Sequence, residues 1–541
     1  MKNFKKIAAA ALGLTMLVSS AAGCGQKADS GELAEPEIKA DKEVPSWKAD
    51  NSSADLSWYI NYDWFAQEWG VDLSSKFITE DTHVNITYMG GGDEKLNTML
   101  ASNDLPDILT IGGENPIVKD AHKFAYPLDE LAAKYDPYFT EHAAKKEILN
   151  FFRLDDGHIY GYPNFSTTKA DYDGGMIYGD EALLVRKDIY AAIGSPDMTT
   201  PQGFLSALKA VKDDGFTDAG GKEIIPFGMR DWGSGPSVLD QTLENFIGVP
   251  SLTDNNEYYD RHADADTLVW IKTIAQAVRE GFASKEMVTM QSDTKDAIVS
   301  NGGYFAYFTE NLNGDPDSLS LFMKENPDKA YIAVEGPKST MGRSRALRGA
   351  GIEGWTQTFI SKSCKNPQKA IELVTYLVSE EGDTVMNYGR LGETYTLVNG
   401  VPTLNADLLE IKQSDPGLFE KEYGLTTHLW LQDSARLSKF MGLDQFPTSL
   451  QQPKEWTQPY LKPQFELSGL DSCLSTEANR NNEKIKQDWV QKCAAMMETE
   501  DDAEVEALMA AHLQYRDANG WAQIVEEYNT KIKENIEKLN P

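Results

Sequence analysis

Apolar and polar positions along the chain alternate between short hydrophobic runs and amphipathic stretches. Residues 106–111, PDILTI, form a short apolar run that stops at two glycines, which is typical of a buried strand. Residues 55–65, DLSWYINYDWF, predict a first strand followed by a loop. Between the two, Leu96, Met99 and Leu100 have the spacing of one helix face. Strands separated by helices indicate βαβ units, so the pattern predicts an α/β fold with a mostly parallel sheet.

Helices later in the chain are predicted from N-capping residues at their starts and from apolar residues that share one helix face. Thr200-Pro201 and Asn366-Pro367 each place a capping side chain before proline, ahead of an amphipathic stretch. We expect Gly382 to close the second of these helices. The C-terminal part is predicted to be helical as well. Its last helix carries a long apolar stripe: Trp521, Ile524, Val525, Tyr528, Ile532, Ile536 and Leu539.

Length and charge limit the classes of protein that remain. The 541 residues predict about three nominal domains or two large lobes. Hydrophobic residues make up 41% of the chain, which argues against disorder. The net charge of −33 disfavours nucleic acid as a partner and disfavours a polybasic mode of membrane binding, since both depend on Lys and Arg. A soluble, acidic, globular body is the remaining class.

The first residues resemble a bacterial lipoprotein leader. Lys2, Lys5 and Lys6 precede the apolar stretch 7–18, which is too short for a transmembrane helix. Small residues then lead to Cys24, and this arrangement predicts cleavage before Cys24 and lipidation of its thiol. An ordinary signal peptide with an incidental cysteine is the alternative. The cleaved protein would carry a charge of −36.

The residues after Cys24 predict a flexible tether over 24–52. They are polar, charged and nearly devoid of aliphatic side chains, so they cannot bury enough surface to fold. Such a segment would let a folded body move near the membrane face.

The remaining cysteines, Cys364, Cys473 and Cys493, form no C-x-x-C pair, which disfavours zinc and redox chemistry. Cys493 lies on an apolar stripe with Trp489, so a buried thiol is favoured over a Cys473–Cys493 disulfide.

Catalytic and metal-binding motifs are missing from the sequence. It contains no HExxH, no P-loop and no GxSxG. The glycines at 90–92 are followed by Asp93 and Glu94, which would repel a phosphate, so a turn is the favoured interpretation. Residues 254–257, DNNE, lack the glycine and final glutamate of a calcium loop and predict a solvated turn. No cofactor and no metal are expected. A pair of glycosidase carboxylates remains open, because sequence spacing alone does not exclude one.

Three predicted loops combine aromatic rings with hydrogen-bonding side chains. Residues 58–65, WYINYDWF, follow the first strand; residues 230–235, RDWGSG, follow a short strand at 224–228; and residues 354–356, GWT, follow a glycine-rich passage. Sugars need this combination, because their C–H faces stack on aromatic rings while their hydroxyls bond to polar side chains. In open α/β sheets, ligands collect beyond the carboxyl ends of strands.

Several loose motifs, in order, resemble the carbohydrate-type extracellular solute-binding lipoproteins that serve ABC importers. The resemblance covers nearly the whole mature chain. The segments that carry it are LSWYINYDWF (56–65), LNTMLASNDLPDIL (96–109), GHIYGYP (157–163), LVRKDIY (184–190), TPQGFLSAL (200–208), IPFG (225–228), NPQKAIELVTYLVSEEG (366–382) and NYGRLGETY (387–395).

This resemblance implies a two-lobe, periplasmic-binding-protein-like fold of type II, with a hinge, an interlobe cleft and a helix-rich C-terminal part. The chain would cross between lobes after GHIYGYP, between Pro163 and Leu184. The implied organisation is a signal peptide (1–23), a tether (24–52), a first lobe (53–165, with 346–400 returning to it) and a second lobe (166–345, with much of 401–541 packing as a helical part).

Ligand contacts are carried over by position in the same resemblance. The first lobe would contribute Asn61, Tyr62 and Trp64, together with Glu114 or Asn115, and Trp355 and Tyr388 would lie near the cleft. The second lobe would contribute Arg230, Asp231, Trp232, Tyr307 and Glu310. Some relatives carry a calcium loop before the IPF segment; here residues 217–222, TDAGGK, offer too few oxygen ligands.

The resulting functional hypothesis is a non-enzymatic, monomeric receptor that captures an oligosaccharide and delivers it to the permease of an ABC importer. It would be held at the outer face of the cell membrane by its lipid anchor alone. A receptor for a peptide or another polar solute is one alternative, and a secreted glycosidase is another.

Overall fold

The chain divides in the computed structural model into a leading unit, Met1–Glu37, and a body, Ile38–Pro541. The structure describes residues 33–36, 39–175, 177–231, 236–312, 316–433, 435, 436, 443 and 446–540. The predicted leader and its Cys24 lie outside the described residues. Within them, every helix is too short or too polar to cross a bilayer.

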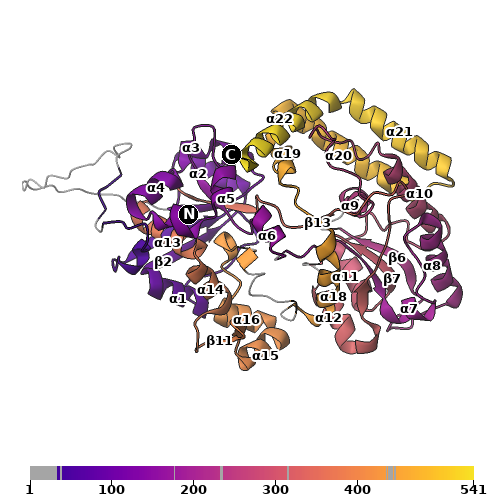
Figure 1. The fold of residues 1–541 in the computed structure, drawn as a ribbon, viewed down its shortest axis with the longest axis horizontal. Helices are drawn as coiled ribbons and strands as arrows, with labels where there is room; N and C mark the ends of the chain where they lie inside the picture. Colours follow the sequence, from indigo (N-terminus) through magenta and orange to yellow (C-terminus); the bar gives the residue numbers. More distant parts are fainter. Residues whose placement is uncertain are drawn as a thin grey trace, which may run out of the picture. The chain divides into compact units, whose positions relative to one another are not determined.

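Two sheets organise the body (Figure 1). The first sheet has the strand order β2-β1-β3-β10-β4, and the second has the order β6-β7-β5-β8. Two pairs of short strands, β11-β12 and β13-β9, lie outside them. The strands are β1 (Ala54–Ile60), β2 (Val84–Gly90), β3 (Ile108–Gly112), β4 (Gly161–Pro163), β5 (Ala182–Arg186), β6 (Ile225–Arg230), β7 (Tyr304–Thr309), β8 (Tyr331–Ala333), β9 (Leu347–Arg348), β10 (Thr356–Ile360), β11 (Tyr395–Val398), β12 (Val401–Leu404) and β13 (Leu461–Lys462).

Pairing in the first sheet brings three distant loops to one edge. β1 runs parallel to both β2 and β3, so their carboxyl ends share an edge. β10 runs antiparallel to β3, with Thr356 opposite Gly112, and its amino end therefore lies at the same edge. The loops after Ile60 and after Gly112 thus meet the segment before Thr356. The loop after Ile60 and the segment before Thr356 are two of the three aromatic loops predicted from the sequence.

The chain passes from the first sheet to the second between β4 and β5, and it returns to the first sheet at β10. In the second sheet, β6 is parallel to β7, while β5 is antiparallel to both β7 and β8. Residues 182–185 of β5 are fully buried, as expected for a central strand covered on both faces. The predicted α/β class is confirmed. The exact lobe boundaries stay a prediction.

Helices cover the sheets and dominate the C-terminal part. They are α1 (Leu73–Thr82), α2 (Asp93–Ser102), α3 (Ala121–Phe124), α4 (Leu128–Tyr135), α5 (Lys146–Phe151), α6 (Lys169–Asp173), α7 (Lys187–Ala192), α8 (Pro201–Asp214), α9 (Gln241–Phe246), α10 (Ala265–Arg279), α11 (Ser292–Ser300), α12 (Pro316–Glu325), α13 (Pro367–Val378), α14 (Glu380–Tyr388), α15 (Ala406–Ser414), α16 (Pro416–Tyr423), α18 (Thr448–Thr457), α19 (Leu470–Cys473), α20 (Thr476–Met496), α21 (Asp502–Ala518) and α22 (Trp521–Leu539).

The two predicted proline-led helix starts are confirmed. The Thr200 side chain accepts a hydrogen bond from the backbone N–H of Gly203 at the start of α8, and the Asn366 side chain caps α13. The predicted end of α13 at Gly382 is wrong. α13 stops at Val378, because Ser379 is extended and caps a new helix, α14. Gly382 lies inside α14, where an added Cβ would come within 2.0 Å of the carbonyl oxygen of Tyr376.

The C-terminal helices pack beside the second sheet's helices and reach the first sheet's helices. α20 and α21 pack on each other, and α21 also contacts α10. α22 runs on to contact α5, a helix between strands of the first sheet (Figure 1). Cys493 of α20 is fully buried in the core and its thiol is free, as is that of Cys473, so the buried thiol is confirmed and the disulfide is wrong.

Part of the predicted tether packs on the body. Trp47 is 4% exposed and meets Tyr376 edge-on, with 5.4 Å between ring centroids. The Ser46 backbone N–H donates to the Asp136 carboxylate at 3.1 Å. The prediction that all of 24–52 is a flexible tether is therefore wrong at its end. A single tryptophan in a polar segment buries enough apolar area to fix its neighbours on the surface.

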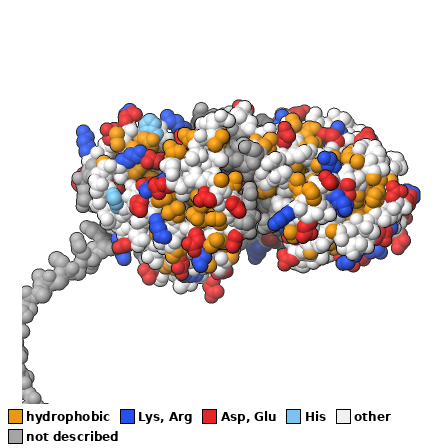
Figure 2. Space-filling model, turned by 90° about the horizontal axis from the view of Figure 1, so that it is seen from below, with side chains coloured by type: hydrophobic (Ala, Val, Ile, Leu, Met, Phe, Trp, Pro, Cys, Tyr) orange, Lys and Arg blue, Asp and Glu red, His pale blue; other side chains and the backbone are white. Residues whose placement is uncertain are grey.

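Charged side chains of both signs are interspersed on the face of the body drawn in Figure 2. Acidic groups are scattered among basic ones there and form no continuous patch.

Candidate functional site

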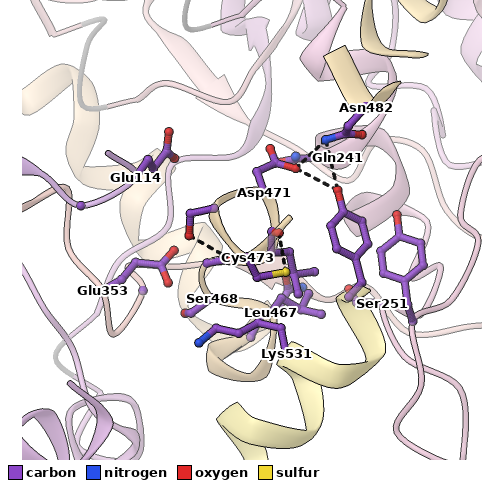
Figure 3. A pocket seen from close by; sticks show the side chains of 18 of the residues that line it. Glu114, Gln241, Ser251, Glu353, Leu467, Ser468, Asp471, Cys473, Asn482 and Lys531 are labelled. Carbon is purple, nitrogen blue, oxygen red and sulfur yellow. Dashed lines mark hydrogen bonds between the residues drawn. The ribbon is translucent and has the colours of Figure 1, made fainter. Parts of the chain in front are cut away.

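A cavity of about 1800 Å³ lies within the body. Its lining comes from the loops at the edge of the first sheet, from the loops beyond β6 in the second sheet, and from helices α19 to α22. Figure 3 shows Glu114 and Glu353 on one side of the view, and Ser251 and Asn482 on the other. The cavity exceeds the roughly 300–1,000 Å³ typical of small-molecule sites, so it has room for a ligand of several units.

Four aromatic rings gather at the edge of the first sheet; we call Tyr62, Trp64, Trp355 and Trp430 the aromatic shelf. The Tyr62 and Trp64 ring centroids are 5.1 Å apart at an interplanar angle of 29°. Trp355 lies 5.3 Å from Tyr62 and 6.4 Å from Trp64. Tyr62 and Trp355 line the cavity. Trp64, 62% exposed, lies beside them, and Trp430, 1% exposed, supports them from within.

Backbone contacts fix the shelf in place. Tyr62 turns out of β1 through a hydrogen bond from its N–H to the Ile60 carbonyl at 2.8 Å. The Gly113 N–H donates to the Trp355 carbonyl at 3.0 Å, which ties the loop after β3 to the segment before β10. Gly354 has φ +62°, and an added Cβ would clash with the Asn164 carbonyl, so only glycine allows Trp355 this approach.

Two predicted site residues support the shelf from behind. Asn61 and Asn115 both donate side-chain N–H groups to the same Asp93 carboxylate oxygen, at 2.7 and 3.0 Å. Asn61 is 8% exposed and also accepts from the Tyr59 hydroxyl at 3.1 Å. Neither asparagine is among the residues that line the cavity. They hold the loops that carry Tyr62 and Glu114.

Two carboxylates border the shelf. Glu114 and Glu353 both line the cavity (Figure 3). Burial raises the pKa of Glu353, and the negative charge of Glu114 adds to the rise. Burial, together with the charge of Glu114, also raises the pKa of Tyr62. Carboxylates next to exposed ring faces can accept hydrogen bonds from a polar ligand that stacks on the rings.

The second sheet contributes a buried polar wall. Asp231 follows β6, lines the cavity and is 1% exposed; its carboxylate pairs with Lys295 Nζ at 2.9 Å. The Ser237 hydroxyl donates to Asp231 at 3.2 Å and lies 2.5 Å from a carboxylate oxygen of Glu310. Arg230 is held behind this wall by Asp296, with Nε 2.9 Å from the carboxylate. The wall is therefore pre-organised before any ligand arrives.

The structure brings together four of the predicted residues at the cavity: Tyr62, Glu114, Asp231 and Trp355. Trp64 stacks beside them. Tyr307 is fully buried in β7 against Tyr304, and Tyr388 is buried in α14 against Tyr395, so both lie in cores away from the cavity lining. Trp232 lies outside the described residues.

Other lining residues escaped the sequence interpretation. Trp430, which supports the lining rings from beneath, lies in a short 3-10 helix, Leu429–Leu431, too short to show a periodic pattern. Trp489 lies on the predicted apolar stripe and is buried, as the stripe predicts. The stripe does not show that the Trp489 ring also lines a cavity. Arg348 and Gln241 are single polar residues at element ends, where polar residues are common.

Within the described residues, no three His, Cys, Asp or Glu side chains gather in a way that could hold a metal. In the segment 217–222, Asp218 instead accepts backbone hydrogen bonds from Gly220 and Lys222 at 2.8 and 2.9 Å. Gly90 ends β2 and Gly92 precedes α2, so residues 90–92 connect a strand to a helix directly and do not form the predicted turn. The exposed turn at 254–257 is as predicted.

Comparison with protein families and solved structures identifies relatives of this chain. The family model for bacterial extracellular solute-binding proteins matches residues 63–384, more than half of the chain. A comparison with curated protein sequences finds no significant match.

Solved structures with the same fold include three binding proteins. An extracellular solute-binding protein from Bifidobacterium longum subsp. infantis has a TM-score of 0.68 at 17% identity, covering 90% of this chain and 99% of its own. An HMO-binding, ABC-transporter-associated solute-binding protein from the same organism has a TM-score of 0.65 at 16% identity, covering 89% and 99%. The Streptococcus pneumoniae ABC-transporter substrate-binding protein FusA, in complex with kestose, has a TM-score of 0.63 at 15% identity, also covering 89% and 99%. The predicted periplasmic-binding-protein-like fold is confirmed.

Proposed function

The chain belongs to the bacterial extracellular solute-binding proteins, and we propose that it captures an oligosaccharide in the cavity and delivers it to the permease of an ABC importer. Two of the similar structures are described as binding HMO or kestose, and both belong to ABC transporters. Their identities to this chain are too low to transfer a ligand, so the sugar assignment depends on the site itself.

The aromatic shelf is the observation that carries the proposal. A tryptophan with 62% of its surface exposed is costly in water unless a partner covers it, and here two cavity-lining rings lie beside it. Pyranose and furanose rings present C–H faces that pack on such rings. Glu114, Glu353 and Gln357 surround the shelf with hydrogen-bonding groups for hydroxyls.

The mechanism is a population shift between open and closed arrangements of the two sheets. A sugar that touches the shelf and the Asp231 wall at once binds the closed arrangement better, so binding favours closure. The protein would act without catalysis, and a separate permease would recognise the closed form. A diacyl anchor on Cys24 would keep the body near the outer membrane face.

A glycan screen tests the proposal. Thermal-shift and calorimetric titrations of the mature protein with neutral oligosaccharides are expected to find at least one ligand, and no hydrolysis product is expected after long incubation. Trp64→Ala combined with Trp355→Ala should abolish most of the binding. Trp69→Ala is the matched control, because Trp69 lies on the same loop but bonds to Thr79 and is not among the cavity-lining residues. Binding of peptides but not of glycans would overturn the sugar assignment.

A further inference from the structure

One part of the cavity lining lies far from the aromatic shelf along the chain and differs from it in chemistry. It includes Glu244 of α9, Arg261 of the following loop, Trp489 of α20, and His512 and Arg516 of α21. We call these five residues the end pocket. We propose that the end pocket binds the terminal, uncharged, polyhydroxylated unit of the ligand, so that the ligand spans from the shelf to the C-terminal helices. The inference rests on the proposed function.

The end pocket is assembled from distant parts of the chain by direct contacts. The Arg261 guanidinium lies 3.1 Å from the Glu244 carboxylate. The next residue, His262, stacks on Trp489 with 4.1 Å between ring centroids. The ring of His512 lies 5.0 Å from that of Trp489. These contacts hold the α20–α21 pair against the loop from the second sheet. Arg516, on the same helix as His512, is paired with Asp260, the residue before Arg261.

Buried polar atoms of the end pocket lack hydrogen-bond partners among the described residues. They are Glu244 Oε1, Arg261 Nε, Trp489 Nε1, His512 Nε2 and Arg516 Nε, and four of these five side chains are at most 4% exposed. Buried polar groups without partners are rare in folded proteins, because each costs about 1–3 kcal/mol. Five of them on side chains that line one cavity point to a polar ligand group as the missing partner.

The formal charges of the end pocket are already balanced. The two cations, Arg261 and Arg516, each have their own carboxylate partner, Glu244 and Asp260. Burial lowers the pKa of His512, and burial lowers that of His262 to about 3, so both rings are neutral at pH 7. No uncompensated charge among these groups remains to attract an ion.

The unpartnered atoms include both donors and acceptors. His512 Nδ1 lies 2.8 Å from the Asp488 carboxylate, which must accept, so Nδ1 carries the proton and Nε2 is an acceptor. Burial raises the pKa of Glu244 to about 7, while the neighbouring Arg261 favours the carboxylate, whose Oε1 is a second acceptor. Trp489 Nε1, Arg261 Nε and Arg516 Nε are donors. A hydroxyl both donates and accepts, and neighbouring hydroxyls on a sugar satisfy this mixed set.

Ionic ligands fit less well. A carboxylate or phosphate only accepts, so it would leave Glu244 and His512 without donors and would be repelled by the glutamate. An ammonium group only donates and would leave Trp489 and Arg516 without acceptors. The mixture of donors and acceptors is thus what favours an uncharged polyol over either ion.

The test uses the full mature protein and linear malto-, cello-, xylo-, manno- and fructo-oligosaccharides of two to six units, with oligogalacturonates of the same lengths. Trp489→Phe removes the Nε1 donor but keeps a ring against His262. It should lower the affinity for the longest oligosaccharide that binds about fivefold. Trp456→Phe is the matched control, since Trp456 belongs to the same half of the body but is not among the lining residues. Glu244→Gln, nearly equal in shape, provides a second variant.

A direct spectroscopic readout accompanies the affinities. In protein labelled with 15N-histidine, the His512 Nε2 signal should move when the longest binding neutral sugar is added. If glycans bind but Trp489→Phe, Glu244→Gln and the His512 signal are all unaffected, the end pocket assignment is overturned while the proposed function stands. If oligogalacturonates bind as tightly as neutral sugars, the uncharged assignment is overturned. If no glycan binds, the proposed function fails, and the end pocket assignment fails with it.

Discussion

The aromatic shelf and the end pocket line the same cavity but differ in almost every physical property. The shelf exposes apolar ring faces, up to 62% of Trp64, whereas the end pocket buries polar atoms, and four of its five side chains are at most 4% exposed. The shelf is built at the edge of the first sheet by strand pairing, and the end pocket is built by packing two C-terminal helices on the loop 258–262. The matched family segment, residues 63–384, includes Trp64 and Trp355 of the shelf and Glu244 and Arg261 of the end pocket, but it stops before Trp489, His512 and Arg516.

Because of this difference, we expect the shelf to determine mainly the affinity for sugars and the end pocket to determine mainly which sugars bind. Ring stacking depends on contact area and tolerates many sugars, so the shelf supplies binding free energy with little discrimination. Hydrogen bonds to buried donors and acceptors discriminate strongly, because a mismatched group leaves a polar atom without a partner. We therefore expect shelf substitutions to lower affinity for all ligands and end-pocket substitutions to change which ligands bind.

The largest expected effect is on the free energy of unfolding, and it distinguishes the buried Trp430 from the exposed Trp64 within the shelf. Trp430→Ala should lower the free energy of unfolding by about 3–5 kcal/mol, because Trp430 is fully buried beneath the exposed rings. Trp64→Ala should change it by less than about 1 kcal/mol, because its ring is largely in solvent. Urea denaturation followed by circular dichroism measures both. Equal losses would show that Trp64 is a structural residue.

The next effect concerns binding through the shelf. Trp64→Ala together with Trp355→Ala should weaken the best glycan roughly 100-fold, about 3 kcal/mol, because two ring faces are lost. Calorimetric titration gives the dissociation constants. A loss of similar size for Trp69→Ala would mean that the loop conformation matters and the stacking does not.

Lowering the pH should reduce the stability of the fold through His262, which stacks on Trp489 of the end pocket. The folded pKa of His262, about 3, lies below its unfolded value of 6.5, so below pH 6.5 the unfolded chain takes up a proton that the folded chain does not. Stability from this group is thus lost as pH falls from 6.5 towards 3. His262→Phe keeps a ring on Trp489 and should gain about 1–2 kcal/mol relative to wild type between pH 7 and pH 5. An equal difference at both pH values, in urea titrations, would contradict the pKa shift.

The smallest expected effect is that of salt. Because the unit bound in the end pocket is uncharged, affinity for a neutral glycan should change less than about twofold between 50 and 500 mM NaCl. A tenfold loss over this range, measured by calorimetry, would indicate an ionic ligand group and would remove the contrast between the two regions.

Local rules explain why much of the fold was predictable from the sequence. The strand at 106–111 ends at glycines, and Thr200 and Asn366 precede prolines, so neighbours in sequence determine these elements. The helix break at Ser379 was missed, because a serine that caps the next helix overrides a glycine three residues later. Trp47 was missed because its partners, Tyr138 and Tyr376, are far along the chain.

The candidate site was predictable only where it follows strand ends. Tyr62, Trp64 and Trp355 come directly after or before strands of one sheet, and the edge of the sheet brings them together. Tyr307 lies inside β7, whose six residues are all buried, and not in the loop after the strand, because the sequence does not mark where this apolar strand ends. The end pocket depends on helix packing between residues 244 and 516, and no local pattern encodes that contact.

A crystal structure of the protein with its best neutral oligosaccharide tests the central claim most directly. We expect one sugar ring against Tyr62, Trp64 and Trp355, and the terminal unit within hydrogen-bond distance of Glu244 Oε1, Trp489 Nε1 and His512 Nε2. A sugar bound elsewhere in the cavity, with the shelf rings uncovered, would contradict the account.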